Sequence, residues 1–311
     1  MKAKKVYEFR TSGEIVSMGN NELYKKIIMQ IATYNKTTPE LIKGIWKFYK
    51  NIIIPDNLKV EYLKDLEIQG DLRIKDNPYI KVIDNVDVHI DLIIDNLPNL
   101  KILKSYTGRP QYYYSSIKIT NCPNLIQLPD NIDTNRIYFY NLPNITKLPN
   151  NINVDNIELT KTNITYIPIL NKNKKANNVE LFENKIEKIE GNQEFVVLSI
   201  TNEPINELPD DLLISDALGI SKTGISELPK ICKVFNGDVN LSYSNIENLN
   251  NVKRIEGFLK LNNTQNIRSL PKDLYIERFL DISNSNVEYI YEENVGGRIF
   301  MNHSAYKNKI I

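Results

Sequence analysis

Histidine and cysteine are scarce in this chain, which has two of each among its 311 residues. Nucleophilic catalysis usually needs an imidazole beside a serine or cysteine, and only His89 and His303 are available to supply one. No Cys-x-x-Cys, His-Glu-x-x-His, Walker or Gly-x-Gly-x-x-Gly motif occurs. Paired carboxylates such as Asp210 and Asp211 are most simply explained as solvated turns. We therefore expect a protein that is not an enzyme, with no catalytic residues, no metal ion and no cofactor.

Long apolar runs and a strong net charge are also lacking. No run of eighteen apolar residues occurs, which argues against a membrane span. The basic start Met1–Lys5 is not followed by an apolar segment, so no secretory signal is expected. Cys122 and Cys232 lie in different parts of the chain, and free buried thiols in a reducing compartment are the simpler interpretation. We expect a cytoplasmic protein, in the host cytoplasm if it is viral. The net charge of +1 makes nucleic acid an unlikely partner.

What the chain does have is one short pattern that returns twelve times between Asp71 and Asn302. Each copy reads apolar, any residue, apolar, then a polar residue, then Ile or Leu, often followed by Leu-Pro. The second apolar residue is the anchor of each copy, and an aliphatic residue lies two positions before every anchor. The anchors are Ile74, Ile94, Ile119, Phe139, Leu159, Leu181, Ile200, Ile220, Leu241, Leu261, Ile282 and Met301. Steps of about 20 residues repeated in this way indicate stacked coils.

The physical chemistry of one copy predicts a strand followed by a turn. The apolar–x–apolar step has a period of two, which predicts a short strand with one buried face. Two further aliphatic residues, such as Ile145 and Leu148, are expected to point inward after the turn. Small polar residues between strand and turn, such as Asn121 and Thr162, are expected to bond to turn backbone and to stack as a ladder. Proline after the last aliphatic residue predicts an extended or 3₁₀ outer side.

These copies resemble leucine-rich repeats of the short bacterial class, in which Leu-Pro follows the strand and turn. Secreted bacterial effectors and phage-encoded repeat proteins use this class. The chain departs from it where Ile replaces Leu and where Leu-Pro is missing, around Ile189, Leu249 and Ile290. The resemblance implies an α+β solenoid, a leucine-rich-repeat superhelix with a parallel β-sheet on its concave face. It also implies binding as the usual function.

The amino-terminal segment does not fit the repeat. A helix is expected over residues 22–34, with Leu23, Ile27, Ile28 and Ile31 on one face. A second helix is expected from Thr38, with Pro39 and Glu40 in its first turn, through Tyr49. The predicted domains are therefore a helical-hairpin cap over residues 1–53, a solenoid over 54–302 and a tail over 303–311. The cap is basic, so docking on an acidic partner or on nucleic acid is the alternative to a covering role.

The surface most suited to binding is the solvent face of the strands. Residues beside the strand aliphatics point to this face because strand side chains alternate. The one long step, from Ile94 to Ile119, holds a tyrosine-rich insertion, and insertions in solenoids often lie on the binding face. Exposed aromatics are common interface anchors. The predicted partner-binding residues are Tyr112, Tyr113, Tyr114, Tyr138, Tyr140, Glu158, Glu180 and Phe182, with Phe258, Phe279 and Phe300 as the alternative cluster.

The sequence thus predicts a non-enzymatic module that binds a partner protein through its concave face. A phage or bacterial effector is one context for such a module. A structural component of a virion or other large assembly is the first alternative. Recognition of a glycan or a nucleic acid is the second. The pattern does not indicate the identity of the partner or the oligomeric state.

Overall fold

The computed structural model describes residues 21–107 and 115–306. The chain is a β-solenoid of about 12 turns, and among the described residues α1 (Asn21–Tyr34) is the only α-helix. This helix is too short and too polar to cross a membrane, and no other described helix could do so. The coils form two compact units, residues 1–145 with 149–151 and residues 146–148 with 152–311.

Unit 1 contains two sheets of mostly parallel strands. Its main sheet has the order β3 (Ile52–Ile54), β5 (Leu72–Lys75), β7 (Asp91–Asp95), β10 (Ser116–Thr120) and β11 (Asn131–Leu142). Its second sheet has the order β1 (Glu40–Ile42), β2 (Ile45–Phe48), β4 (Tyr62–Ile68), β6 (Val82–Val88) and β8 (Ile102–Leu103), and β9 (Tyr106–Thr107) also pairs with β6. Only β1 and β2 pair antiparallel among these strands.

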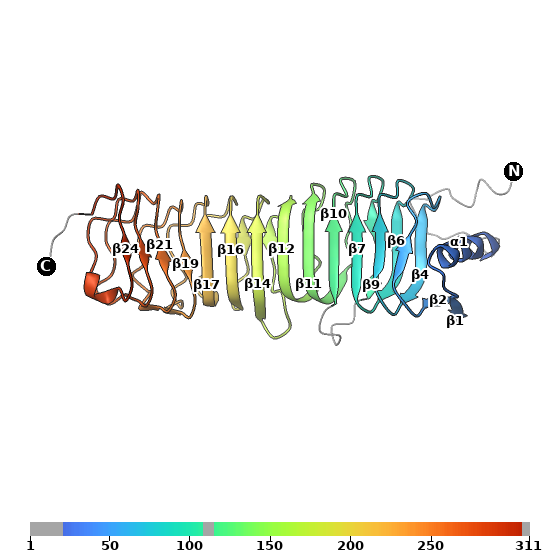
Figure 1. Cartoon of the computed structure of the whole chain (residues 1–311), viewed down its shortest axis with the longest axis horizontal. Helices are drawn as coiled ribbons and strands as arrows, with labels where there is room; N and C mark the ends of the chain where they lie inside the picture. The colour runs from blue at the N-terminus through green and yellow to red at the C-terminus, as the bar shows by residue number, and fades with distance from the viewer. Residues whose placement is uncertain (1–20, 108–114, 307–311) are drawn as a thin grey trace. The chain divides into compact units, whose positions relative to one another are not determined.

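Unit 2 repeats the same plan over more coils, whose strands lie side by side in chain order (Figure 1). Its main sheet consists of β12 (Asn151–Thr162), β14 (Lys175–Phe182), β16 (Glu194–Thr201), β17 (Leu213–Ser221), β19 (Val239–Asn240), β21 (Leu259–Lys260), β23 (Leu280–Asp281) and β24 (Ile299–Phe300). Its other strands are β13 (Tyr166–Ile167) with β15 (Lys188–Ile189), and β18 (Val234–Phe235) with β20 (Arg254–Ile255) and β22 (Tyr275–Ile276). A 3₁₀ turn covers Glu292–Asn294. The expectation of extended or 3₁₀ structure after each turn is confirmed.

The register of the main sheets is the one that the anchors predict. Leu72 pairs with Leu92 and Ile74 with Ile94, and the same step recurs between the later strands. Every anchor from Ile74 to Ile282 is buried, and only the last anchor, Met301, is exposed. The inward residues after the turns are buried as well, from Ile145 and Leu148 onward. Burial of this column supplies most of the free energy that stabilises the coils, at about 25 cal/mol per Å² of apolar surface.

A left-handed residue closes each strand of the repeat. The residue two positions after every anchor has a φ between 52° and 62°. These residues are Asp76, Asn96, Asn121, Asn141, Lys161, Glu183, Asn202, Lys222, Tyr243, Asn263, Asn284 and His303. Asn and Asp predominate because their short polar side chains tolerate this conformation best. Asn141 donates to Asn121 and Asn96 donates to Asp76, so part of the predicted ladder lies here. The other part, with Thr162 and Asn184, lies one residue later and inside the coil.

The prediction of a helical hairpin at the amino terminus is wrong in its second half. The helix over residues 22–34 is confirmed as α1, which buries Ile28 and Ile31. The second helix is replaced by the hairpin of β1 and β2, in which Ile42 pairs with Ile45. The two residues between these strands, Lys43 and Gly44, have φ values of 51° and 84°. A two-residue loop with positive φ at both positions suits a hairpin and cannot continue a helix.

The solenoid also begins earlier than residue 54. β2 pairs with β4, and β3 pairs with β5, so residues 45–54 already supply strands to both sheets of unit 1. α1 packs beside this first coil. Its Tyr24 hydroxyl donates to the Lys64 carbonyl at 2.5 Å and accepts from the Lys64 amide at 2.8 Å. Just after it, Asn35 bonds to the backbone of Ile53 in both directions.

We expect the substitutions Leu159→Asp and Ile220→Asp to unfold several adjacent coils of unit 2. Each places an unpaired carboxylate at a site that is at most 1% exposed, which should cost more than about 4 kcal/mol. Circular dichroism melting curves check this, with the exposed substitution Lys185→Asp as the matched control. An unchanged melting curve for either buried variant would contradict the register.

The left-handed positions predict an unusual gain from glycine. Lys222 has a φ of 52° and is exposed, so Lys222→Gly removes the strain of a left-handed side-chain-bearing residue. We expect a gain of about 0.5–1 kcal/mol in the free energy of unfolding, measured by urea denaturation. The control Lys188→Gly, in the extended strand β15, should instead lose stability. Equal losses in both variants would refute the role of the turn.

Candidate binding surface

The solvent face of each main sheet carries three rows of side chains. Because side chains alternate along a strand, the positions one before, one after and three before an anchor share this face. The positions directly before the anchors were expected to face solvent, and all twelve are exposed or half-buried. They are Arg73, Ile93, Lys118, Tyr138, Glu158, Glu180, Ser199, Gly219, Asn240, Lys260, Asp281 and Phe300. This assignment of inward and outward positions is therefore confirmed.

In unit 1, Tyr138 and Tyr140 lie half-buried on the solvent face of β11. The register places Lys118 of β10 beside Tyr138 and Thr120 beside Tyr140. The Lys118 ammonium lies over the Tyr138 ring, with Nζ 4.6 Å from the ring centroid, in a cation–π contact. The predicted site residues Tyr112, Tyr113 and Tyr114 lie outside the described residues.

In unit 2, Glu158 and Glu180 are direct neighbours across β12 and β14. Thr160 pairs with Phe182, whose side chain is 40% exposed. The Glu180 carboxylate accepts a bond from the Asn178 amide at 2.5 Å. The predicted acidic edge therefore exists, with an exposed phenyl ring beside it. The two tyrosines belong to unit 1 and these three residues to unit 2, so a single strip of all five stays a prediction.

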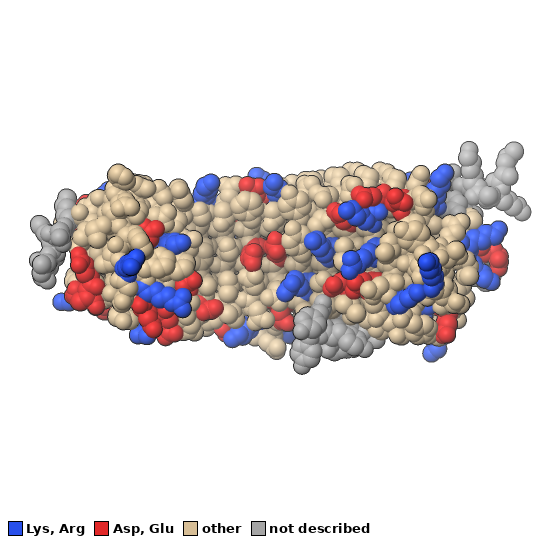
Figure 2. Space-filling model, viewed as in Figure 1, with Lys and Arg blue, Asp and Glu red and all other residues tan. Residues whose placement is uncertain are grey.

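Unit 2 has a groove of about 410 Å³ on the solvent face of its main sheet. Its lining is Ser199, Thr201, Gly219, Ile220, Ser221, Asn240, Ser242, Tyr243, Lys260, Asn262 and Asp281. We call this concavity the neutral groove, because Lys260 and Asp281 are its only charged residues and have opposite signs. Charged side chains are sparse over β16 and β17 on the face that Figure 2 shows.

Successive coils carry small side chains in the part of the neutral groove formed by β16 and β17. Ser199 and Gly219 are register partners at the position before the anchor, and Thr201 and Ser221 are partners after it. Three positions before these anchors are Val197 and Ala217. Larger side chains border this gap on both sides along the sheet, beginning with Phe182, the register partner of Thr201. The groove is therefore a local absence of side-chain volume on the sheet, close to a register shift between Phe195 and Val197 in the same pair of strands.

Three phenyl rings lie close to Lys260, one of the residues that line the neutral groove. Phe258 and Phe279 stack with ring centroids 4.8 Å apart, and Phe300 meets Phe279 edge-on at 5.6 Å. Lys260 holds its ammonium 4.8 Å from the Phe258 centroid and 5.8 Å from that of Phe279. We call Phe258, Phe279 and Phe300 the phenyl cluster. Phe258 and Phe279 directly precede β21 and β23, and Phe300 lies in β24, so the alternative cluster predicted from sequence is brought together.

Sequence reasoning named these phenylalanines but missed the groove. Exposed aromatic residues draw attention because they are costly on a surface, whereas Ser199 and Gly219 carry no chemical signal alone. The available signal was that two successive coils both carry a small residue, Ser199 and Gly219, at the position before the anchor. In a parallel, in-register sheet such a succession always produces a hollow.

A buried polar chain holds the ends of the strands that lead to the groove. Asn184 accepts bonds from the Thr162 backbone amide and hydroxyl at 3.0 and 2.8 Å. Glu203, 3% exposed, accepts from the Asn184 backbone and side-chain amides at 2.8 Å and from the Ile186 amide at 3.0 Å. Burial raises the pKa of this carboxyl above its ordinary value, and the amide donors oppose the rise.

The remaining reactive side chains fall into two groups. Cys122 and Cys232 are buried free thiols, as expected. Burial raises the pKa of Cys122 to about 11 and raises that of Cys232 as well, so both are poor nucleophiles at neutral pH. Among the described residues, one group could hold a metal ion, formed by Glu67, Asp87 and His89. It lies in unit 1, on β4 and at the end of β6.

No protein-family model, curated protein or solved structure that was compared with the chain matches it.

The raised pKa of Glu203 predicts a pH dependence of stability. A group that is protonated more readily in the folded state contributes stability below its ordinary pKa, and this contribution is lost as pH rises through the raised pKa. Glu203→Gln is uncharged at every pH and serves as the reference. We expect the free energy of unfolding of the wild type, relative to this variant, to fall between pH 4 and pH 7 in urea titrations. A constant or rising difference would contradict the burial effect.

Proposed function

We propose that the chain is a non-enzymatic module that binds a partner protein through the solvent face of its main sheet in unit 2. The observation that carries this proposal is the neutral groove, with Phe182 beside its Thr201 and the phenyl cluster beside its Lys260. Aromatic anchors around a cleft are the typical centres of binding energy at protein interfaces. The strands beneath are paired with their neighbours through backbone groups, which reduces the ordering entropy that binding would cost.

The chemistry of the neutral groove describes the partner segment that suits it. Hydroxyl and amide groups from Thr201, Ser221 and Asn262 offer both donors and acceptors along the floor. Lys260 and Asp281 are direct register partners and together present a dipole with no net charge. A segment with uncharged polar side chains fits the floor, and an apolar residue at its end would stack on the phenyl cluster. The acidic pair Glu158 and Glu180 favours a basic residue beyond the other end.

The class of the coils and the role of the helix are part of the same proposal. Coils of about 20 residues with Leu-Pro after the turn support a relation to short bacterial leucine-rich repeats, whose binding face is the concave one. α1 supports a capping role, since Ile28 and Ile31 are fully buried beside the first coil. A solenoid needs such a cover because its terminal coil otherwise exposes its core.

Recognition of a glycan is the second candidate, and a specific observation favours it. Most residues that line the neutral groove carry a hydroxyl or a carboxamide, which are the groups that hydrogen-bond sugar hydroxyls. Faces of phenyl rings, as in the phenyl cluster, also pack well on the apolar side of a sugar ring. Such a ligand would be uncharged, and its affinity would depend little on salt.

Filling the neutral groove should abolish partner binding without disturbing the fold. A methyl group added at Gly219 would meet its nearest neighbour, the Ser199 hydroxyl, at 3.5 Å, so the site has room for a side chain. We expect Gly219→Phe to weaken binding at least about thirtyfold, the value of one strong anchor, and to leave the melting curve unchanged. The measurement is a pull-down from source cells with mass spectrometry, followed by titration of the captured protein.

Three further variants locate the anchors. Phe258→Ala with Phe279→Ala tests the phenyl cluster, Tyr138→Ala with Tyr140→Ala tests the face of unit 1, and Tyr79→Ala is the exposed-tyrosine control. We expect Phe258→Ala with Phe279→Ala to lose at least about tenfold in affinity and Tyr79→Ala to lose none. A loss of about tenfold in Tyr138→Ala with Tyr140→Ala would extend the binding surface to unit 1. Normal binding by Gly219→Phe and by both double variants would reject the proposal. Capture of a sugar from a glycan panel by the wild type alone would select the second candidate, and co-purification with particles would indicate a structural role.

A further inference from the structure

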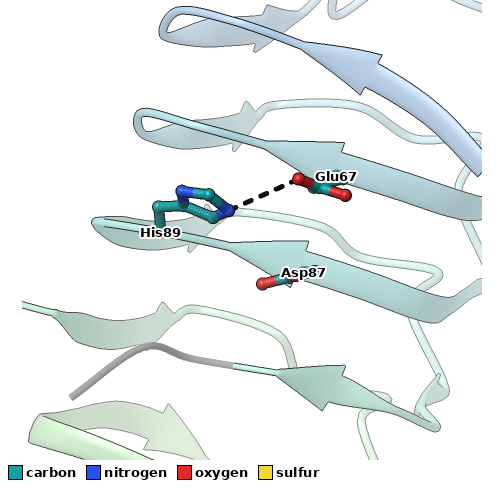
Figure 3. A group of neighbouring side chains, drawn as sticks. All are labelled: Glu67, Asp87 and His89. Atoms are coloured by element: carbon teal, nitrogen blue, oxygen red, sulfur yellow. Dashed lines mark ion pairs between the residues drawn. The ribbon is translucent and has the colours of Figure 1, made fainter. Parts of the chain in front are cut away.

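A cluster of three metal-ligand side chains is built into unit 1 by its register. Glu67 of β4 and Asp87 of β6 are direct partners in the parallel ladder. His89 lies two residues after Asp87, so alternation directs both side chains to one side. Figure 3 shows the His89 ring directed toward Glu67, with Asp87 on the neighbouring strand. The three residues thus converge from two consecutive coils.

The distances in this cluster approach those around a single ion. The ligand atoms of the three residues lie within 4.8 Å of one another, and His89 Nε2 is 3.7 Å from Glu67 Oε1. Ligand atoms about 2.1 Å from a tetrahedral ion are about 3.4 Å apart. Small rotations of the two carboxylates would therefore bring all three atoms to bonding distance, and the backbone would not need to move.

The electrostatics of the cluster also favour a cation. Two carboxylates in direct register repel each other, and the Glu67 side chain is only 13% exposed, with the His89 side chain at 10%. Lys47 of β2 pairs with the other Glu67 oxygen, Oε2, at 2.6 Å. That contact leaves Oε1 on the side of His89.

We propose that Glu67, Asp87 and His89 bind one divalent transition-metal ion, which clamps β4 to β6. One imidazole nitrogen with two carboxylate oxygens suits Zn²⁺ and its neighbours better than Ca²⁺ or Mg²⁺, which prefer all-oxygen sites. Three protein ligands leave a fourth position for water. Lys47 is a competing cation, held against the oxygen that faces away from the ion. This site is in unit 1 and is independent of the groove proposed for partner binding.

Isothermal titration of the chelator-treated full chain with Zn²⁺ tests the proposal. We expect one ion per chain, and a rise in Tm of about 5 °C or more at a hundredfold excess over Kd. Glu67→Gln, Asp87→Asn and His89→Gln should each weaken binding at least about tenfold and lose the rise in Tm. The controls His303→Ala and Glu61→Gln, the latter in a neighbouring ion pair with Lys81, should bind as the wild type does.

A fourth variant keeps all three ligands and so tests the site even where a ligand variant misfolds. Lys47→Met removes the competing ammonium and should tighten Zn²⁺ binding about threefold or more, since a nearby like charge opposes the ion. Binding of no ion by the wild type would overturn the proposal. One bound ion that persists in both Asp87→Asn and His89→Gln would also overturn it, as would weaker binding by Lys47→Met.

Discussion

Backbone hydrogen bonding between each coil and the next, in fixed register, is the constraint on which the rest of this structure depends. Each strand is too short to bury an apolar face alone, and it gains stability only when the next coil lies on it with the same residue opposite. Once that register holds, the residues at any one position of the repeat lie next to one another on successive coils and form a row. The anchors form a buried column, the left-handed residues form a line of turns, and the residues between the aliphatics form a surface.

Rows explain both the regular and the irregular chemistry of the molecule. A row of aliphatic residues is favourable, whereas a row of like charges is not. A row that holds like charges therefore needs neighbouring groups that compensate them. Glu67 and Asp87 share a row with Lys47 on β2, and the imidazole of His89 lies beside them. Glu203 and Asn184 occupy successive buried turn positions, where amide donors and a carboxylate acceptor satisfy one another. In each case a polar group in one coil makes the polar group in the next coil tolerable.

The sequence predicted the parts of the fold that follow from the register between successive coils. The period of about 20, the buried anchors and the outward positions follow from apolar spacing alone, and α1 follows from its periodicity. The prediction of a second helix was wrong because Thr38, Pro39 and Glu40 are residues that favour a helix start. That preference was given more weight than the turn tendency of Lys43 and Gly44. Those two residues take positive φ and turn the chain into a hairpin. The helix-capping preference of Thr38, Pro39 and Glu40 is therefore overridden by the turn between β1 and β2, which are strands of the second sheet of unit 1.

The candidate site was predicted less well than the fold, for a physical reason. Aromatic residues such as Phe182 and Phe258 could be named from the sequence because they are large and lie at outward positions. The groove could not, since a hollow is a property of neighbouring coils and not of one residue. Its recognition needs the register, which says that Ser199 lies beside Gly219. The metal-ligand cluster was missed similarly, since Glu67 and His89 are distant in sequence and meet only through the ladder.

The neutral groove is made by small side chains at outward positions of the sheet, and this separates its shape from the stability of the fold. The pairing of the strands under Ser199 and Gly219 is made by backbone groups, so its hydrogen bonds do not depend on what those side chains are. Selection could therefore move, deepen or close the hollow through single substitutions on the outer rows, with the buried column untouched. Proteins built on this plan could bind different ligands through different outer side chains, while the buried column and the backbone pairing stay the same.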